Sequence, residues 1–216
     1  MADQGITMSA ESIPLIQAKL KTQTRRVINL PDDGLAFDYI AHTPSDSIYT
    51  GGWYRMVYVP LCGADRPIGD PIRCPWGKPG DRLYCKEPWG IVSRVRTGYA
   101  VFYPLDGVTR CVSVGPEIPC QKYDAMIHEG KVRSSRHMPK WAARIWLDLT
   151  DVRAEWLLDI SPEDAIAEGV HPDVDSAVAD YLAWWDRHHL KRGHPSADNP
   201  MVWALTFTLN EEAARA

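Results

Sequence analysis

A short polar segment near the start of the chain carries side chains that can do acid–base and nucleophilic chemistry. Residues 21–26 read Lys-Thr-Gln-Thr-Arg-Arg, and a single carboxylate, Glu87, closes a strand-like segment about sixty residues later. Lys21, Thr24 and Glu87 offer an amine, a hydroxyl and a carboxylate. These groups suffice for nucleophilic and acid–base catalysis without a metal ion.

Glu87 is expected to face the protein interior because it has the same strand parity as Leu83 and Cys85. A buried carboxylate must be paired, hydrogen-bonded or protonated, and Lys21 is a suitable partner. Lys21 and Thr24 share a face if their segment is a helical turn, but not if it is a straight strand. Spacing alone favours a structural ion pair between Lys21 and Glu87, with Thr24 as a cap, over a catalytic site.

The elements that must position these residues are mostly strands. Alternating apolar residues and turn signals predict strands over 53–59, 82–87, 99–103, 108–114, 144–150 and 202–209. Capping signals and apolar periodicity predict short helices over 13–20, 162–168 and 176–189. Residues 28–72, rich in Pro, Gly, Asp and Ser, are interpreted as a surface excursion, and residues 115–140 as irregular. This mixture predicts an α+β protein built on a mixed sheet or small barrel.

Composition narrows the class of protein. A chain of 216 residues fits one domain, and its net charge of −4 argues against a general polyanion-binding protein. The charge is uneven, since residues 131–144 hold five basic side chains and no acid. The five cysteines form no CxxC pair, and the histidines at 188, 189 and 194 lack partners at metal-binding spacing, so no metal site is predicted. Without a signal peptide or a membrane-length apolar run, we expect a cytoplasmic protein with no membrane partner.

Five further side chains are candidates for substrate binding. Arg25 and Arg26 can hold a phosphate or carboxylate, although for one of them an ordinary ion pair on the strand surface is the favoured explanation. Trp76 and Trp89 flank the strand that ends at Glu87 and can stack a pyrimidine, although core filling explains at least one. Asn199 can read an amide or base edge, although Asn before Pro is also a plain turn signal.

Five blocks form a pattern along the chain. They are Lys-Thr-Gln-Thr-Arg-Arg at 21–26, Cys-Pro-Trp-Gly-Lys-Pro-Gly-Asp-Arg-Leu at 74–83, His-Met-Pro-Lys-Trp-Ala-Ala-Arg-Ile at 137–145, Asp-Ile-Ser-Pro-Glu-Asp-Ala at 159–165 and Asn-Pro-Met-Val-Trp at 199–203. The pattern resembles the ASCH domain, a PUA-like fold, in the form common in bacteriophages and prophages. The resemblance implies an α+β fold with a small β-barrel or curled mixed sheet. It implies a single domain over residues 1–216, with insertions near 28–72 and 93–137.

The resemblance also implies an activity. The best-understood ASCH enzymes are small bacterial amidohydrolases of N4-acetylcytidine and related N4-acylated cytosines. Their motif is a lysine, two intervening residues, a threonine and a distant glutamate, and Lys21, Thr24 and Glu87 occupy those places. By this resemblance Thr24 is the nucleophile, Lys21 its activating base and Glu87 the group that protonates the departing amine. The implied hydrolase acts on a modified nucleoside and needs no cofactor.

A second hypothesis comes from a different class. A non-catalytic PUA-like module would bind RNA or a modified base, with Lys21, Arg25 and the basic run 131–144 contacting phosphates and aromatic rings stacking a base. An RNA-cleaving variant of this module would use Lys21 and Glu87 as acid and base. Release of cytidine and acetate from N4-acetylcytidine separates the two classes.

Overall fold

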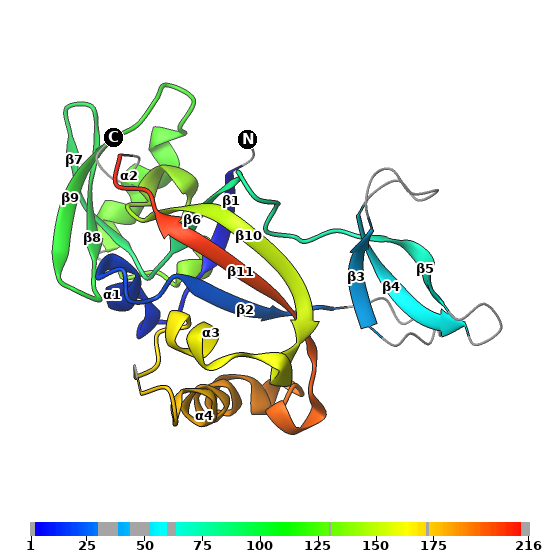
Figure 1. Cartoon of the computed structure of the whole chain (residues 1–216). Coiled ribbons are helices and arrows are strands. Elements are labelled where there is room, and N and C mark those ends of the chain that lie inside the picture. The colour runs from blue at the N-terminus through cyan, green and yellow to red at the C-terminus, as the bar shows by residue number, and fades with distance from the viewer. Residues whose placement is uncertain are drawn as a thin grey trace. The chain divides into compact units, whose positions relative to one another are not determined.

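The structure, a computed structural model, describes residues 3–29, 39–43, 52–59, 64–129, 131–171 and 173–212. Within these residues the protein is a mixed α+β fold with many strands and few, mostly short helices (Figure 1). The strands are β1 (Asp3–Thr7), β2 (Gln23–Val27), β3 (Tyr39–Thr43), β4 (Gly52–Val59), β5 (Ala64–Ile72), β6 (Arg82–Lys86), β7 (Gly90–Val95), β8 (Gly98–Tyr103), β9 (Val108–Ser113), β10 (Trp146–Trp156) and β11 (Met201–Leu209). The α-helices are α1 (Ser12–Gln17), α2 (Cys120–Glu129), α3 (Pro162–Ala167) and α4 (Ala177–His189). Short 3-10 turns cover Ser135–His137, Lys140–Ala142, Leu157–Asp159, Leu190–Arg192 and Ser196–Asp198.

The strands form three sheets. The largest has the order β1-β6-β10-β11-β2, and two three-stranded sheets have the orders β3-β4-β5 and β7-β8-β9. The large sheet is mixed, because β1 runs parallel to β6 whereas β10 runs antiparallel to β6 and β11 antiparallel to β2. Within the described residues this sheet ends at β1 and β2 and is not closed into a barrel. The α+β class and the shared sheet of β6, β10 and β11 are therefore confirmed.

The chain divides into two compact units, each assembled from separate stretches of sequence. Unit 1 contains Met1–Lys19, Asp81–Asp148 and Leu209–Ala216, and unit 2 contains Leu20–Gly80 and Leu149–Thr208. One boundary falls inside β10, after Asp148, and another falls inside β11, after Thr208. The prediction of a single domain over residues 1–216 stays a prediction.

Unit 1 has an aromatic core beside the sheet β7-β8-β9. Trp89, Tyr99 and Tyr103 are buried there, and Tyr123 of α2 packs against them. The ring of Trp141 meets those of Trp89 and Tyr123 edge to face, with centroids 5.9 and 4.9 Å apart. Such pairs add stability beyond the area they bury. The insertion predicted near 93–137 therefore contributes Tyr99, Tyr103 and Tyr123 to a packed core.

Unit 2 has a core formed by α3, α4 and the start of β11. Ala165 of α3, Tyr181 and Trp185 of α4 and Val202 of β11 are buried together. Figure 1 shows α3 next to strand β2 and α4 next to α3. Helix α3 thus packs against the strand that carries residues 23–27, and α4 contributes Tyr181, whose ring centroid lies 5.8 Å from the guanidinium carbon of Arg25.

Several predicted elements agree closely with the structure. The predicted helices 162–168 and 176–189 correspond to α3 and α4, and the predicted strands 99–103 and 108–114 correspond to the antiparallel pair β8 and β9. The predicted strand at 144–150 is longer than expected, because β10 continues to Trp156. Among the described residues, no helix is long and apolar enough to cross a bilayer.

Two predictions about irregular segments were wrong. The region 115–140 contains helix α2, whose residues carry no strong capping signal in the sequence. Residues 28–72 were expected to hold one strand, yet β3 and β5 flank the expected strand β4 in one sheet. Residues 30–38, 44–51 and 60–63 of that region lie outside the described residues.

Candidate functional site

Strand β2 directs its polar side chains to two opposite faces, as the period of two in a strand requires. On one face, Gln23 donates from Nε2 to Asp164 Oδ1 at 3.0 Å. On the other face, Arg26 donates from Nη1 to Thr24 Oγ1 at 2.9 Å. Arg25 lies on the same face as Gln23 and donates to its Oε1 at 2.5 Å. The segment is therefore a strand, not the helical turn that would place residues 21 and 24 on one face.

Lys21, just before β2, forms a buried ion pair with Glu168. Its Nζ lies 2.5 Å from Glu168 Oε2 and donates to the Glu168 backbone oxygen, also at 2.5 Å. The Lys21 side chain is 2% exposed and that of Glu168 1% exposed. Burial lowers the pKa of the Lys21 amine, and the charge of Glu168 acts in the opposite direction. The amine also lies 5.7 Å from the ring centroid of Trp184.

Glu168 owes its position to the way helix α3 begins and ends. Ser161 caps the helix by accepting from the Asp164 backbone N–H. Pro162 occupies the first turn, where a backbone N–H would have no carbonyl partner within the helix, so its absence costs nothing. The helix ends at Ala167 with Glu168 as its C-cap, and Gly169 follows with a φ of 94°. Because the last carbonyl groups of a helix lack internal partners, the Glu168 carbonyl is available to Lys21.

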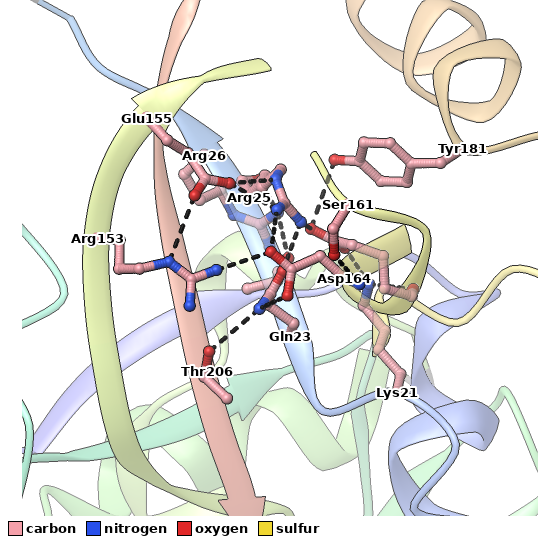
Figure 2. Close-up of polar contacts among 12 residues, drawn as sticks. Lys21, Gln23, Arg25, Arg26, Arg153, Glu155, Ser161, Asp164, Tyr181 and Thr206 are labelled. Carbon is pink, nitrogen blue, oxygen red and sulfur yellow. Dashed lines mark hydrogen bonds and ion pairs between the residues drawn. The ribbon is translucent and has the colours of Figure 1, made fainter. Parts of the chain in front are cut away.

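Arg25 connects this ion pair to a larger charged cluster (Figure 2). Its guanidinium donates to Glu155 Oε1 from Nε at 3.0 Å and from Nη2 at 2.6 Å, and to Asp164 Oδ2 at 3.0 Å. Arg153 donates to the same Asp164 oxygen at 2.7 Å. Tyr181 donates to Glu168 Oε1 at 3.4 Å, and burial followed by the Glu168 charge raises the pKa of the tyrosine. The cluster is hydrogen-bonded throughout, as buried charges require.

Thr24 is buried, with 1% exposure, and its hydroxyl accepts from Arg26. That contact uses a lone pair of the oxygen and leaves the hydroxyl hydrogen available to another acceptor. No hydrogen bond joins Thr24 to Lys21 in the described part of the chain, where the amine donates to Glu168. The structure therefore pairs Lys21 with Glu168 and Thr24 with Arg26.

Glu87 is fully buried, as its parity with Leu83 and Cys85 predicts. Its two carboxylate oxygens accept from Arg144 Nε and Nη2, both at 2.7 Å, in a bidentate ion pair. The remaining guanidinium nitrogen of Arg144 donates to Asp106 at 2.6 Å. Glu87 belongs to unit 1, whereas Lys21 and Thr24 belong to unit 2, so the convergence of these three residues stays a prediction.

The other predicted binding residues have varied environments. Trp89 is 1% exposed within the aromatic core of unit 1. Trp76 is half-buried in the turn between β5 and β6. Asn199 has a φ of 45°, and its Oδ1 accepts from the Leu158 backbone N–H at 2.8 Å, an arrangement suited to a turn. Their roles in substrate binding stay predictions.

Sequence reasoning missed the carboxylate that pairs with Lys21. Glu168 lies 147 positions away from Lys21 in the chain, and no periodic pattern connects residues so far apart. One feature of the sequence could have indicated it: a glutamate directly before the glycine that ends a helix is expected at the C-cap of that helix. Arg144, the partner of Glu87, lies inside one of the blocks that carry the family resemblance.

The comparisons with known proteins add no neighbour: no family model, curated protein or solved structure matches the chain. Among the described residues, no group of three or more His, Cys, Asp or Glu side chains is arranged to hold a metal ion. The candidate site of unit 2 is thus defined by its own geometry: a buried amine, a buried carboxylate and a threonine hydroxyl on adjoining elements.

Proposed function

We propose that the protein is a PUA-like ASCH amidohydrolase that cleaves the acyl amide of N4-acetylcytidine or a related N4-acylated cytosine nucleoside. The observation that carries this proposal is the ion pair between Lys21 and Glu168, with 2.5 Å between Nζ and Oε2. Lys21 lies three residues before Thr24 in the chain. An amine held beside a carboxylate in a desolvated site can exchange a proton with it and act as a base. The sheet that joins β6, β10 and β11 is compatible with the proposed fold family.

Lys21 is the proposed base and Thr24 the proposed nucleophile. A base must release its own proton before it accepts another, and burial that lowers the pKa of the Lys21 amine favours the neutral form. Thr24 accepts from Arg26 and so retains a hydroxyl hydrogen to give away. Because Lys21 and Thr24 do not share a face of their segment, the proposal requires substrate binding to bring the amine and the hydroxyl within reach, directly or through one water, as catalytic hydrogen bonds often form only in the substrate complex.

The carboxylate in this proposal is Glu168 rather than Glu87. Glu168 contacts the Lys21 amine directly, whereas both oxygens of Glu87 are engaged by Arg144. Glu168 and Lys21 also belong to the same unit, so a proton can pass directly between them. The structural role of Glu87 is then to anchor Arg144 inside unit 1.

The proposed reaction balances with these groups. The Thr24 oxygen attacks the acyl carbon while its proton moves to Lys21, and Glu168 gives a proton to the amide nitrogen as the C–N bond breaks. Cytidine leaves, and the acyl group is an ester on Thr24. Water then gives a proton to Glu168 as it attacks the ester, and Lys21 returns its proton to the Thr24 oxygen. The products are the carboxylic acid and cytidine, and the enzyme is restored.

The test is chromatographic detection of cytidine released from N4-acetylcytidine. Loss of a proton-transfer group typically costs about 10²–10⁴-fold in rate, so Thr24→Val, Lys21→Met and Glu168→Gln should each reduce turnover by about that factor. Their effects should not add, since the three residues would act as a unit. A chelator should leave turnover unchanged.

The matched control is Glu87→Gln, a change of the same chemistry in the other buried carboxylate. The proposal expects this variant to keep turnover whenever circular dichroism shows that it folds. If Glu87→Gln loses turnover while Glu168→Gln keeps it, then Glu87 is the proton donor, as the family resemblance implies, and Glu168 is not. Wild-type protein that releases no cytidine from any of several N4-acylcytidines would favour the non-catalytic binding module.

A further inference from the structure

A second candidate site lies in unit 1, within the insertion that the family resemblance leaves unexplained. A pocket of about 460 Å³ opens between helix α2 and the segment that follows it. Lys122 lines it from α2, and Lys131 and Arg133 line it from the following segment. Arg133 is fixed by its backbone, which exchanges hydrogen bonds with Trp89 at 3.1 and 2.7 Å. The pocket wall is therefore anchored to the aromatic core of the unit.

The charge of this pocket differs from that of the other pockets of unit 1. Of two such pockets, one is lined by Asp106 and Glu211 as well as by arginines, and the other by Asp3 and Glu117. Among the side chains that the structure describes, no carboxylate lines the pocket beside α2. The whole chain has a net charge of −4, whereas the described charged side chains that line this pocket are all positive. Such a cationic hollow attracts an anion.

The remaining lining of the pocket is partly apolar and includes the imidazole of His137. Tyr123 and Met126 of α2 contribute to it, and Val132 contributes a side chain that is 53% exposed. Ser134 adds a hydroxyl, whose oxygen accepts from the Arg136 backbone N–H and whose hydrogen can be donated. Cations, a hydroxyl and apolar surface in one pocket suit a ligand with an anionic group and a flat ring.

We propose that this pocket binds the phosphate group of a nucleotide, with Lys122, Lys131 and Arg133 around the phosphate and the base against Met126 and Val132. The volume of about 460 Å³ is in the range of small-ligand sites and fits one nucleotide. The same chemistry is available from a free nucleotide or from a nucleotide within a single strand. The proposal does not depend on amide hydrolysis, because it concerns binding by residues of unit 1 alone.

The experiment measures binding by isothermal titration calorimetry at low and at moderate salt. The probes are cytidine 5′-monophosphate, cytidine, inorganic phosphate and a single-stranded RNA of ten nucleotides. The variants are Lys131→Glu and Lys122→Glu, and the control is Lys191→Glu, an equal charge change at an exposed position of unit 2. All three positions are exposed, so the variants are expected to fold, which circular dichroism checks.

The proposal expects cytidine 5′-monophosphate to bind more tightly than cytidine, with affinity that falls as salt rises. Loss of one charged contact should weaken binding about tenfold or more in Lys131→Glu and Lys122→Glu, and not in Lys191→Glu. If only the RNA binds, with the same lysine dependence, a strand is the source of the phosphate. Equal affinities for cytidine and cytidine 5′-monophosphate would overturn the proposal. Equal affinities of wild type, Lys131→Glu and Lys122→Glu for the phosphate-containing probes would also overturn it. So would binding of a poly-glutamate peptide as tight as that of the nucleotide probes.

Discussion

Lys21 and Glu168 are the residues whose energetics most directly test the candidate site. Each is almost fully buried, so removal of Glu168 takes away the carboxylate that neutralises the Lys21 amine, and removal of Lys21 leaves Glu168 only the longer ion pair with Arg25, at 3.5 Å. Lys21→Met should therefore destabilise the fold by about 3–5 kcal/mol, and Glu168→Leu by a similar amount. The double variant should lose much less than the sum, since both charges are then absent and their volume is filled by apolar atoms. Urea unfolding of the four proteins measures this coupling, and additive losses would show that the pair is not a unit.

His189, at the end of α4, makes stability depend on pH. Its ring stacks on that of Trp185 with centroids 3.9 Å apart, and no hydrogen-bond partner of its Nδ1 is found among the described residues. Burial, together with the positive charge of Arg192, lowers the pKa of His189 to about 4 from the ordinary 6.5. Between these values the unfolded chain binds more protons than the folded one, so stability falls as pH falls from 6.5 towards 4. The expected loss is on the order of 1–2 kcal/mol once solvent screening is allowed for, and none is expected from this group above pH 6.5.

The measurement compares wild type with His189→Phe, which keeps a ring against Trp185 but carries no proton. For each protein the free energy of unfolding at pH 4.5 is subtracted from that at pH 7, and the two differences are compared. The contribution of the carboxylates is the same in both proteins and cancels in this comparison. Wild type should lose more stability on acidification than the variant. An equal loss in both would mean that His189 is protonated in the folded protein at no cost.

At the scale of elements, the sequence predicts best where one face of a strand or helix is buried. Alternation identifies β6, β10 and β11 because their apolar side chains fill a core on one side. Strand β5 was missed because it contains two prolines and a glycine, which weaken a strand signal. The candidate site was only half predictable for a similar reason. Residues 21–26 are adjacent in sequence, but their carboxylate partner comes from the end of α3, which only tertiary folding brings to β2.

At the scale of the whole molecule, chain connectivity argues against independent units. The unit boundaries fall inside β10 and β11, so each of these strands contributes residues to both units. Unfolding of one unit would therefore disorder one end of each shared strand. We therefore expect one cooperative unfolding transition, as small domains usually show. Trp89 and Trp203 lie in different units and are both 1% exposed, so Trp89→Phe and Trp203→Phe alter the fluorescence signal from one unit at a time. Urea curves followed by tryptophan fluorescence and by far-ultraviolet circular dichroism should coincide for wild type and, at its own midpoint, for each variant. Two separated transitions, each sensitive to a different tryptophan, would mean that the units unfold independently and that the prediction of a single domain is wrong.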